Sequence, residues 1–400
     1  VHSFFARHRK ATIFRVMLLF SLFTVFSNCI NPITPALFLE LGFPDYMFGV
    51  GYAAMAGACF LLSPVWGKLC EKYGYTNILG GSFIGYALVQ VVFSISTSQS
   101  VVILCRFMGG AAYSAGAVAS LAYLIAVAPS GQNHRLMLYY SATTTVGCAA
   151  GYAIGGFIGT VSIQLMFRIQ ILVLLILGAV LFSILKDPEV SIKVQESVSK
   201  QSGQKRRRMK LFDPLFFLTV FLSNFAASGY DNAYNYYVKE ALNFPNYYNG
   251  LIRAGIGLIT LVMTVTIGTW IAKKFDLRLS LIPVLLLCGT ITYGVCLLRS
   301  PAAFVIGNFL YYAVNALYLP FQQGILSDSG GPEDSGHLAG QFNSFQFGGK
   351  VFGALCAGFI YSLGNKLPFI ISSAIFFLSV AFALADFGQQ RHRARHRVPL

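Results

Sequence analysis

Residues 63–74 read SPVWGKLCEKYG and connect two long apolar runs of the chain. Two glycines of this stretch bracket three charged side chains, in the order Gly67, Lys68, Glu71, Lys72 and Gly74. A degenerate copy, GTWIAKKFD, occupies residues 268–276 and starts 201 residues after Gly67. Two apolar halves that carry a similar charged turn at a similar depth predict an internal repeat.

The chain has too little polar surface for a soluble protein. Of its 400 residues, 56% are hydrophobic and only 11% are charged, whereas a soluble domain carries about 25% charged residues. A helix that spans a bilayer needs about 20 mostly apolar residues. Twelve runs meet this need, at about residues 13–38, 45–67, 77–96, 100–128, 136–160, 165–185, 213–238, 247–272, 279–298, 302–326, 338–362 and 367–386. The sequence therefore predicts an all-α membrane protein with twelve transmembrane helices.

One long polar segment divides these runs into two groups of six. We expect an N-terminal half at 1–185, a basic cytoplasmic linker at 186–212, a C-terminal half at 213–386 and a basic cytoplasmic tail at 387–400. The first run is too long for the apolar core of a signal peptide, so we interpret it as a spanning helix.

The formal charge of +15 fits either nucleic-acid binding or an asymmetric membrane topology. With a cytoplasmic N-terminus, 22 of the 29 lysines and arginines fall on the cytoplasmic side and four on the other. Three lie inside predicted helices, namely Arg106, Arg253 and Lys350. Positive residues favour the cytoplasmic side, which places both termini there and needs no nucleic acid. We expect the linker and the tail to contact anionic lipid headgroups.

The sequence offers no cofactor or metal motif. The eight cysteines form no CxxC pair, and the six histidines show no ligand spacing. No phosphate-binding G-x-x-x-x-G-K-[ST] occurs, which argues against ATP as an energy source. A polytopic membrane enzyme would need nucleophiles, metal ligands or paired carboxylates near a lipid interface. We therefore expect no enzyme activity, no cofactor and no metal.

The opening stretch fits a loop motif written G-x-L-a-D-r-x-G-r-r. The matching positions are Gly67, Leu69, Lys72 and Gly74. Glu71 takes the place of the aspartate, and Tyr75 and Thr76 replace the closing basic pair. Residues 106–110 fit a second motif, R-x-x-x-G. Through these motifs the chain resembles the major facilitator superfamily, which implies two six-helix halves that work by alternating access.

Residues 147–156 fit the antiporter motif G-x-x-x-G-P-x-x-G-G, with Tyr152 in place of the proline. Over nearly all of residues 10–386, the chain is similar to drug:proton antiporters of the bacterial quinolone-efflux type. The resemblance implies a monomer in the bacterial cell membrane that exports small lipophilic or drug-like molecules. It assigns conformational gating to Gly67, Glu71, Lys72, Gly74, Gly151 and Gly155. Glycines at four-residue spacing also predict that this helix packs tightly against a helix of the other half.

The resemblance assigns proton coupling to Asp231 and Arg106. Asp231 stands where such pumps carry a membrane carboxylate followed by aromatic residues. Two other interpretations of Asp231 remain open, a permanent ion pair with Arg253 and a polar cluster at the outer end of the helix. An arginine inside a membrane is costly and indicates function. Arg106 then serves proton coupling or substrate contact, and the alternative is a structural arginine bonded to backbone carbonyls.

Polar residues on four predicted helices are expected to face the substrate cavity. They are Asn28, Asn31, Tyr234, Asn235, Gln322, Asn343 and Gln346. Residues 315–320 lack the second carboxylate and the arginine that quinolone-type pumps carry before a proline. This departure, with the missing proline at Tyr152, supports a second hypothesis: a proton-linked or facilitative carrier of a sugar or an amino acid.

Overall fold

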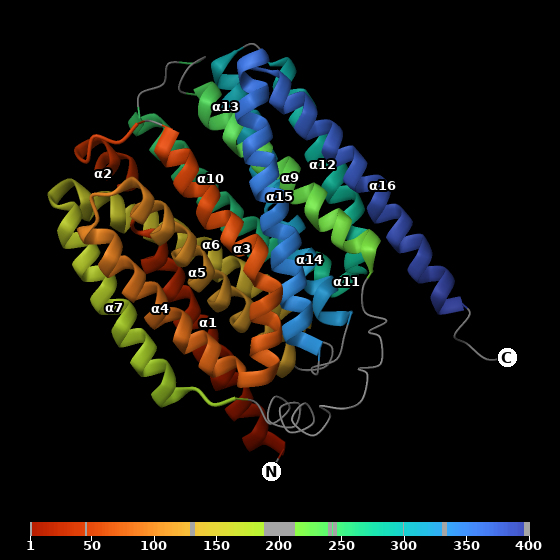
Figure 1. Cartoon of the computed structure of the whole chain (residues 1–400). Coiled ribbons are helices and arrows are strands. Elements are labelled where there is room, and N and C mark those ends of the chain that lie inside the picture. The colour runs from red at the N-terminus through yellow and green to blue at the C-terminus, as the bar shows by residue number, and fades with distance from the viewer. Residues whose placement is uncertain are drawn as a thin grey trace. The chain divides into compact units, whose positions relative to one another are not determined.

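The computed structural model describes residues 2–44, 46–128, 133–187, 213–238, 242, 246–298, 300–329 and 334–395 (Figure 1). Within these ranges every regular element is a helix, and no strand occurs. Residues 188–212 of the predicted linker and 396–400 of the predicted tail lie outside the described residues. The expected all-α architecture is confirmed for the part of the chain that is described.

The first seven helices follow the first six predicted runs. They are α1 (His2–Asn28), α2 (Thr34–Glu40), α3 (Tyr46–Tyr73), α4 (Tyr75–Ile95), α5 (Gln99–Val127), α6 (Asn133–Val161) and α7 (Ile163–Ile184). The first predicted run, 13–38, is not continuous, because α1 ends at Asn28. Pro32 has no N–H to donate to the carbonyl of Asn28, four residues earlier. A turn over residues 29–33 separates α1 from α2.

The remaining helices follow the other six runs. They are α9 (Pro214–Tyr236), α10 (Asn246–Met263), a π-helical turn (Thr264–Gly268), α11 (Thr269–Lys274), α12 (Leu277–Leu297), α13 (Pro301–Asn315), α14 (Tyr318–Asp328), α15 (Ser335–Leu363) and α16 (Leu367–Arg395). The predicted run 302–326 is broken between α13 and α14. Pro320 cannot bond the carbonyl of Ala316, and the hydroxyl of Thr264 donates to that oxygen at 3.4 Å.

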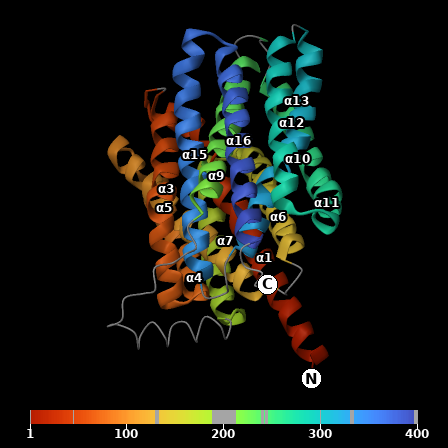
Figure 2. The same ribbon diagram turned by 90° about the vertical axis from the view of Figure 1, so that its right-hand side faces the viewer.

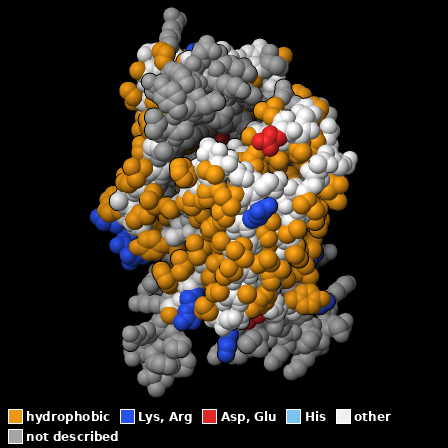
Figure 3. All heavy atoms as spheres, turned by 90° about the vertical axis from the view of Figure 1, so that its left-hand side faces the viewer, with side chains coloured by type: hydrophobic (Ala, Val, Ile, Leu, Met, Phe, Trp, Pro, Cys, Tyr) orange, Lys and Arg blue, Asp and Glu red, His pale blue; other side chains and the backbone are white. Residues whose placement is uncertain are grey.

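Ten helical segments among the described residues are long and apolar enough to cross a membrane. Helices α9 and α15 are not among them, so the count of twelve stays a prediction. Hydrophobic side chains cover most of the face shown in Figure 3. Large apolar residues remain exposed on α6, including Phe157 at 77% and Val161 at 73%. Such an apolar surface fits contact with lipid.

The chain forms two compact units that are interleaved in sequence. Unit 1 comprises residues 1–133, 143–208 and 330–344, and unit 2 comprises residues 134–142, 209–329 and 345–400. The beginning of α6 thus belongs to unit 2, and the beginning of α15 belongs to unit 1. In unit 2, α16 runs beside both α9 and α12 (Figure 2). The predicted division of the chain into halves at the linker stays a prediction.

Glycines bring α6 against α1 in unit 1. A Cβ atom on Gly151 would lie 2.3 Å from the carbonyl oxygen of Val25, and one on Gly155 would lie 1.8 Å from that of Cys29. Tight packing of this helix is therefore confirmed, but its expected partner in the other half is wrong. The glycines of α6 have no side chains, so the backbone of α1 in the same unit can approach them closely at positions four residues apart.

Unit 2 repeats this arrangement between α15 and α9. A Cβ atom on Gly349 would lie 2.3 Å from the carbonyl oxygen of Phe221, and one on Gly353 would lie 2.2 Å from that of Phe225. Each unit therefore joins two of its helices through glycines four residues apart. This shared packing supports the internal repeat inferred from the two charged turns.

Candidate functional site

A polar network surrounds Arg106 of α5 in unit 1. The side chain is only 7% exposed. Its Nη1 donates to Asn31 Oδ1 at 3.3 Å, and its Nη2 donates to Thr34 Oγ1. Asn31 in turn donates to Asn28 Oδ1 at 3.0 Å. The structure thus brings together three predicted site residues, and both acceptors of Arg106 are side-chain oxygens rather than backbone carbonyls.

The break between α1 and α2 positions this network. Asn31 lies in the turn that follows α1, and Thr34 begins α2, so both present side chains that a continuous helix would orient differently. Sequence reasoning missed Thr34. Pro32 and its polar neighbours indicate a helix break, and this feature of the sequence could have identified Thr34.

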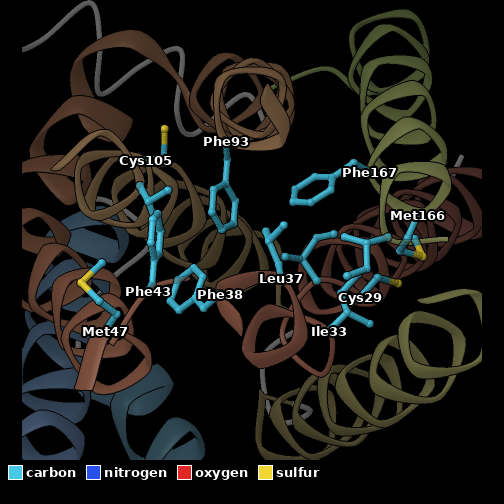
Figure 4. Packing of buried hydrophobic residues seen from close by; sticks show 13 residues of the cluster. Cys29, Ile33, Leu37, Phe38, Phe43, Met47, Phe93, Cys105, Met166 and Phe167 are labelled. Atoms are coloured by element: carbon cyan, nitrogen blue, oxygen red, sulfur yellow. The ribbon is translucent and has the colours of Figure 1, made fainter. Parts of the chain in front are cut away.

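An apolar cluster flanks the Arg106 network. Figure 4 shows Leu37, Phe38, Phe43 and Phe93 gathered from different parts of unit 1. The guanidinium carbon of Arg106 lies over the Phe93 ring, 5.0 Å from its centroid. This geometry is a cation–π contact, which stabilises a cation where water is scarce. The network therefore combines a charge, neutral polar groups and aromatic surface.

Asp231 of α9 lies among tyrosines in unit 2. The hydroxyl of Tyr312 donates to Asp231 Oδ1 at 2.6 Å, and Asp231 itself is half-buried. The Tyr312 ring makes edge contacts with Tyr230 and Tyr234 at centroid distances of 6.1 Å. Tyr312 was missed by sequence reasoning, because the sequence does not show which helix faces α9.

Lys350 of α15 lies beside the same face of α9. Ser228 donates its hydroxyl to the Lys350 carbonyl oxygen at 2.8 Å, and Ser228 precedes Asp231 by three residues. Residues three apart on a helix share a face, so the backbone of Lys350 lies about one turn from Asp231. The ion pair with Arg253 is not tested, because the Arg253 side chain lies outside the described residues.

The other predicted cavity residues differ in burial. Tyr234 is buried and Asn235 is exposed. Gln322 of α14 is fully buried and donates to Ser223 of α9 at 2.8 Å. Its Oε1 atom accepts no hydrogen bond from the described residues. Gln322 therefore tightens the contact between α14 and α9.

Two further cavity candidates lie on α15. Asn343 and Gln346 are each 6% exposed. Asn343 donates to the Ala339 carbonyl oxygen at 3.0 Å, one helical turn earlier. This local bond satisfies part of the amide within its own helix.

The expectation of a charged turn at residues 63–74 is wrong, because residues 63–73 form the end of α3 and only Gly74 separates α3 from α4. This end of α3 packs against the beginning of α15 in unit 1. Glu71 is buried at 5% exposure, and its Oε1 accepts the backbone N–H of His337 at 2.9 Å. A Cβ atom on Gly67 would lie 2.4 Å from the Gly336 carbonyl oxygen. Glu71 thus satisfies one of the unpaired N–H groups at the start of α15, where a negative charge is also favoured.

Tyr75 strengthens the same contact. Its buried hydroxyl lies 2.7 Å from Ser335 Oγ, the first residue of α15. Tyr75 stands where the loop motif has a basic residue, and its role was missed because its partner is 260 residues away. Gly74 has a φ of 90°, which favours glycine. Lys72 is exposed and lies over the Tyr73 ring at 4.9 Å.

The second charged stretch, residues 268–276, is helical up to Lys274 and makes different contacts in unit 2. Asp276 accepts the backbone N–H groups of Arg278 and Leu279, at 2.7 and 3.2 Å, and so caps α12. The Arg278 guanidinium bonds to Asp386 of α16 and lies 3.8 Å from Asp213, the residue before α9. Sequence reasoning did not find this cluster, which joins three helices through one arginine.

Comparisons with known proteins agree with this architecture. The family model described as Major Facilitator Superfamily matches residues 16–349. Multidrug resistance protein 1 of Bacillus subtilis (strain 168) is 23% identical over 385 residues, covering 94% of this chain and 97% of the relative. Quinolone resistance protein NorA of Staphylococcus aureus (strain COL) is 24% identical over 391 residues, covering 95% and 97%.

Two solved structures show a similar fold at low identity. The human organic anion transporter MFSD10 (TETRAN) has a TM-score of 0.79 and 17% identity, covering 94% of this chain and 99% of that chain. The proton:xylose symporter XylE has a TM-score of 0.77 and 15% identity, covering 94% and 96%. The expected major facilitator fold is confirmed.

Proposed function

Because the chain belongs to the major facilitator superfamily, we propose that it exports small lipophilic or drug-like molecules in exchange for protons. Members of this family are transporters of small molecules and not enzymes, and the chain is a multi-pass membrane protein. The names of the relatives from Bacillus subtilis and Staphylococcus aureus refer to multidrug and quinolone resistance. These names support export of drug-like molecules by this chain.

The observation that carries the proposal is the Asp231 carboxylate beside Tyr312. Asp231 lies in the predicted spanning run 213–238, and a carboxylate within a membrane is costly and indicates function. When Asp231 takes up a proton, the charge disappears from its aromatic surroundings, and the conformation that buries this residue more deeply becomes favoured. When it releases the proton on the other side, the opposite conformation is favoured. A proton gradient would thereby drive alternating access.

The segment Gly67–Gly74 at the end of α3 supports a gating role within this mechanism. The Glu71 bond to His337 and the contact of Tyr75 with Ser335 hold the start of α15 against α3. We assign the breaking and re-forming of these two contacts to the conformational cycle. The tight packing at Gly151 and Gly155 would keep α6 and α1 moving as one body.

The same proposal includes the setting of the protein. The bacterial relatives and the placement of basic residues support a bacterial cell membrane with both termini in the cytoplasm. We propose a monomer whose basic segments contact lipid headgroups and which binds no nucleic acid. Protons and a small molecule are its transported species.

A second candidate function is a proton-linked or facilitative carrier of a sugar or an amino acid. The observation that favours it lies at the break between α13 and α14, where residues 315–320 read NALYLP and carry no charge. Quinolone-type pumps have a carboxylate and an arginine there. Movement of a sugar or an amino acid out of everted membrane vesicles, which corresponds to import into the cell, would support this candidate.

The test uses everted membrane vesicles that contain the full chain. An imposed proton gradient, acid inside, should drive uptake of ethidium or norfloxacin into these vesicles and release of protons from them. Asp231→Asn should abolish the coupled proton release, whereas Asp231→Glu, which keeps a carboxylate, should retain part of it. Undiminished proton-coupled transport by Asp231→Asn would refute the assigned role of Asp231.

A further inference from the structure

The positive charge of Arg106 has no carboxylate counterpart among the described residues of unit 1. The acidic residues described there are Glu40, Glu71, Asp187 and Asp334. Glu71 accepts a backbone N–H from α15, and Asp187 accepts one from Thr76. No described acidic side chain forms an ion pair with Arg106. A buried charge of this kind is costly unless something else pairs with it.

The hydrogen-bonding capacity of this guanidinium is only partly used. Of its five N–H donors, one bonds Asn31 and one bonds Thr34. The Nε atom makes no hydrogen bond to the described residues. The guanidinium therefore has N–H donors that no described residue uses.

The surroundings of Arg106 suit an aromatic acid. Asn28 and Asn31 are half-buried, and Tyr152 of α6, which takes the place of the motif proline, is 50% exposed and close enough to interact electrostatically with Arg106. The Phe93 ring lies against the guanidinium carbon. The unused donors of Arg106 and the exposed ring of Tyr152 fit a flat molecule with a carboxylate.

We infer that Arg106 is the docking point for the carboxylate of a transported organic anion or zwitterion. The inference rests on the proposed function only in that the chain carries a small molecule. A planar guanidinium presents parallel N–H donors that match the two oxygens of a carboxylate. Such a ligand supplies the missing negative charge, whereas a purely cationic substrate would add a second positive charge near Arg106.

The test measures equilibrium binding to the purified full chain in detergent, without any gradient. The probes are norfloxacin, nalidixic acid and 2-naphthoic acid, each paired with its methyl ester, and titration calorimetry gives the dissociation constants. Wild-type protein should bind each acid about 10- to 100-fold more tightly than its ester, because a charge-assisted hydrogen bond is lost with the charge. This comparison needs no variant.

Variants separate this role from a structural one. Arg106→Gln should lose the preference for the acids while binding the esters as before, and Arg106→Lys should keep part of it. Arg168→Gln removes an exposed arginine of α7 and should change neither the affinity for the acids nor the affinity for the esters. Thermal melting confirms that each variant is folded.

Two results would overturn the inference. One is that no acid binds more tightly than its ester to the wild-type protein. The other is that folded Arg106→Gln loses acids and esters equally. Because no gradient is applied, a failure of proton-driven export would leave these binding results unchanged, so the two proposals fail separately.

Discussion

The Glu71 carboxylate accepts the backbone N–H of His337 at 2.9 Å, across 266 residues of sequence. The bond places a buried negative charge at the start of α15, where the helix dipole is positive. It depends on the close approach of Gly67 to Gly336, which allows the two helices to meet at backbone distance. A side chain near the end of α3 therefore acts as an N-terminal cap for a distant helix.

Removal of this cap should destabilise the protein measurably. Glu71→Ala should lower the free energy of unfolding by about 1–2 kcal/mol, the range found for lost N-terminal caps. Glu71→Gln should cost less, because its amide oxygen still accepts the bond. Thermal melting in detergent checks both values. Lys72→Gln in the same turn serves as the control, since Lys72 is exposed, and an equal loss of stability there would contradict the capping role.

Tyr75 and Ser335 should be energetically coupled. Each of Tyr75→Phe and Ser335→Ala removes one side of a buried hydrogen bond of 2.7 Å. Together the two substitutions should cost less than the sum of their separate effects, by about 0.5–1.5 kcal/mol. A double-mutant cycle of unfolding free energies measures this coupling. Strict additivity would show that the contact contributes nothing.

The glycines of α6 should tolerate alanine very unequally. Gly155→Ala places a Cβ atom 1.8 Å from the Cys29 carbonyl oxygen, so α6 and α1 must separate. Overpacking of this kind costs about 1–3 kcal/mol. The neighbouring Gly156 has no atom within 4 Å of such a Cβ, and Gly156→Ala should stabilise the helix by up to about 1 kcal/mol. Melting temperatures that move in opposite directions are the expected result.

Arg278 should be essential for the stability of unit 2. Arg278→Gln leaves Asp386, at 4% exposure, and the nearby Asp213 without their common cation. Removing one partner of a buried ion pair costs about 3 kcal/mol or more. A second substitution, Asp386→Asn, removes the stranded charge and should restore much of the loss. Unfolding of the single and double variants tests this, and a double variant no more stable than Arg278→Gln would contradict it.

The charged turns show how far local sequence information reaches. Their similarity predicted an internal repeat, and both units do join helices through glycines four residues apart. The partners of the two turns nevertheless differ, because Glu71 caps α15 whereas Asp276 caps the helix that follows it. The motif therefore predicted neither the local structure, which is helical up to Tyr73 and up to Lys274, nor the contacts of the two stretches.

The helix breaks were within reach of sequence reasoning but were not predicted. Pro32 and Pro320 each leave a carbonyl four residues earlier without its helical donor. The first of these breaks brings Asn31 and Thr34 to Arg106. The broken helix, and not the apolar run itself, created this part of the candidate site.

The sequence by itself determined the membrane class, the helical runs and the small-residue face of α6, because composition and periodicity are local properties of the chain. Only the tertiary structure decided that α6 packs on α1, that Tyr312 donates to Asp231, and that Arg106 bonds neutral oxygens. These pairings join residues far apart in sequence, and they depend on which helices become neighbours once backbone contacts and buried polar groups are satisfied together.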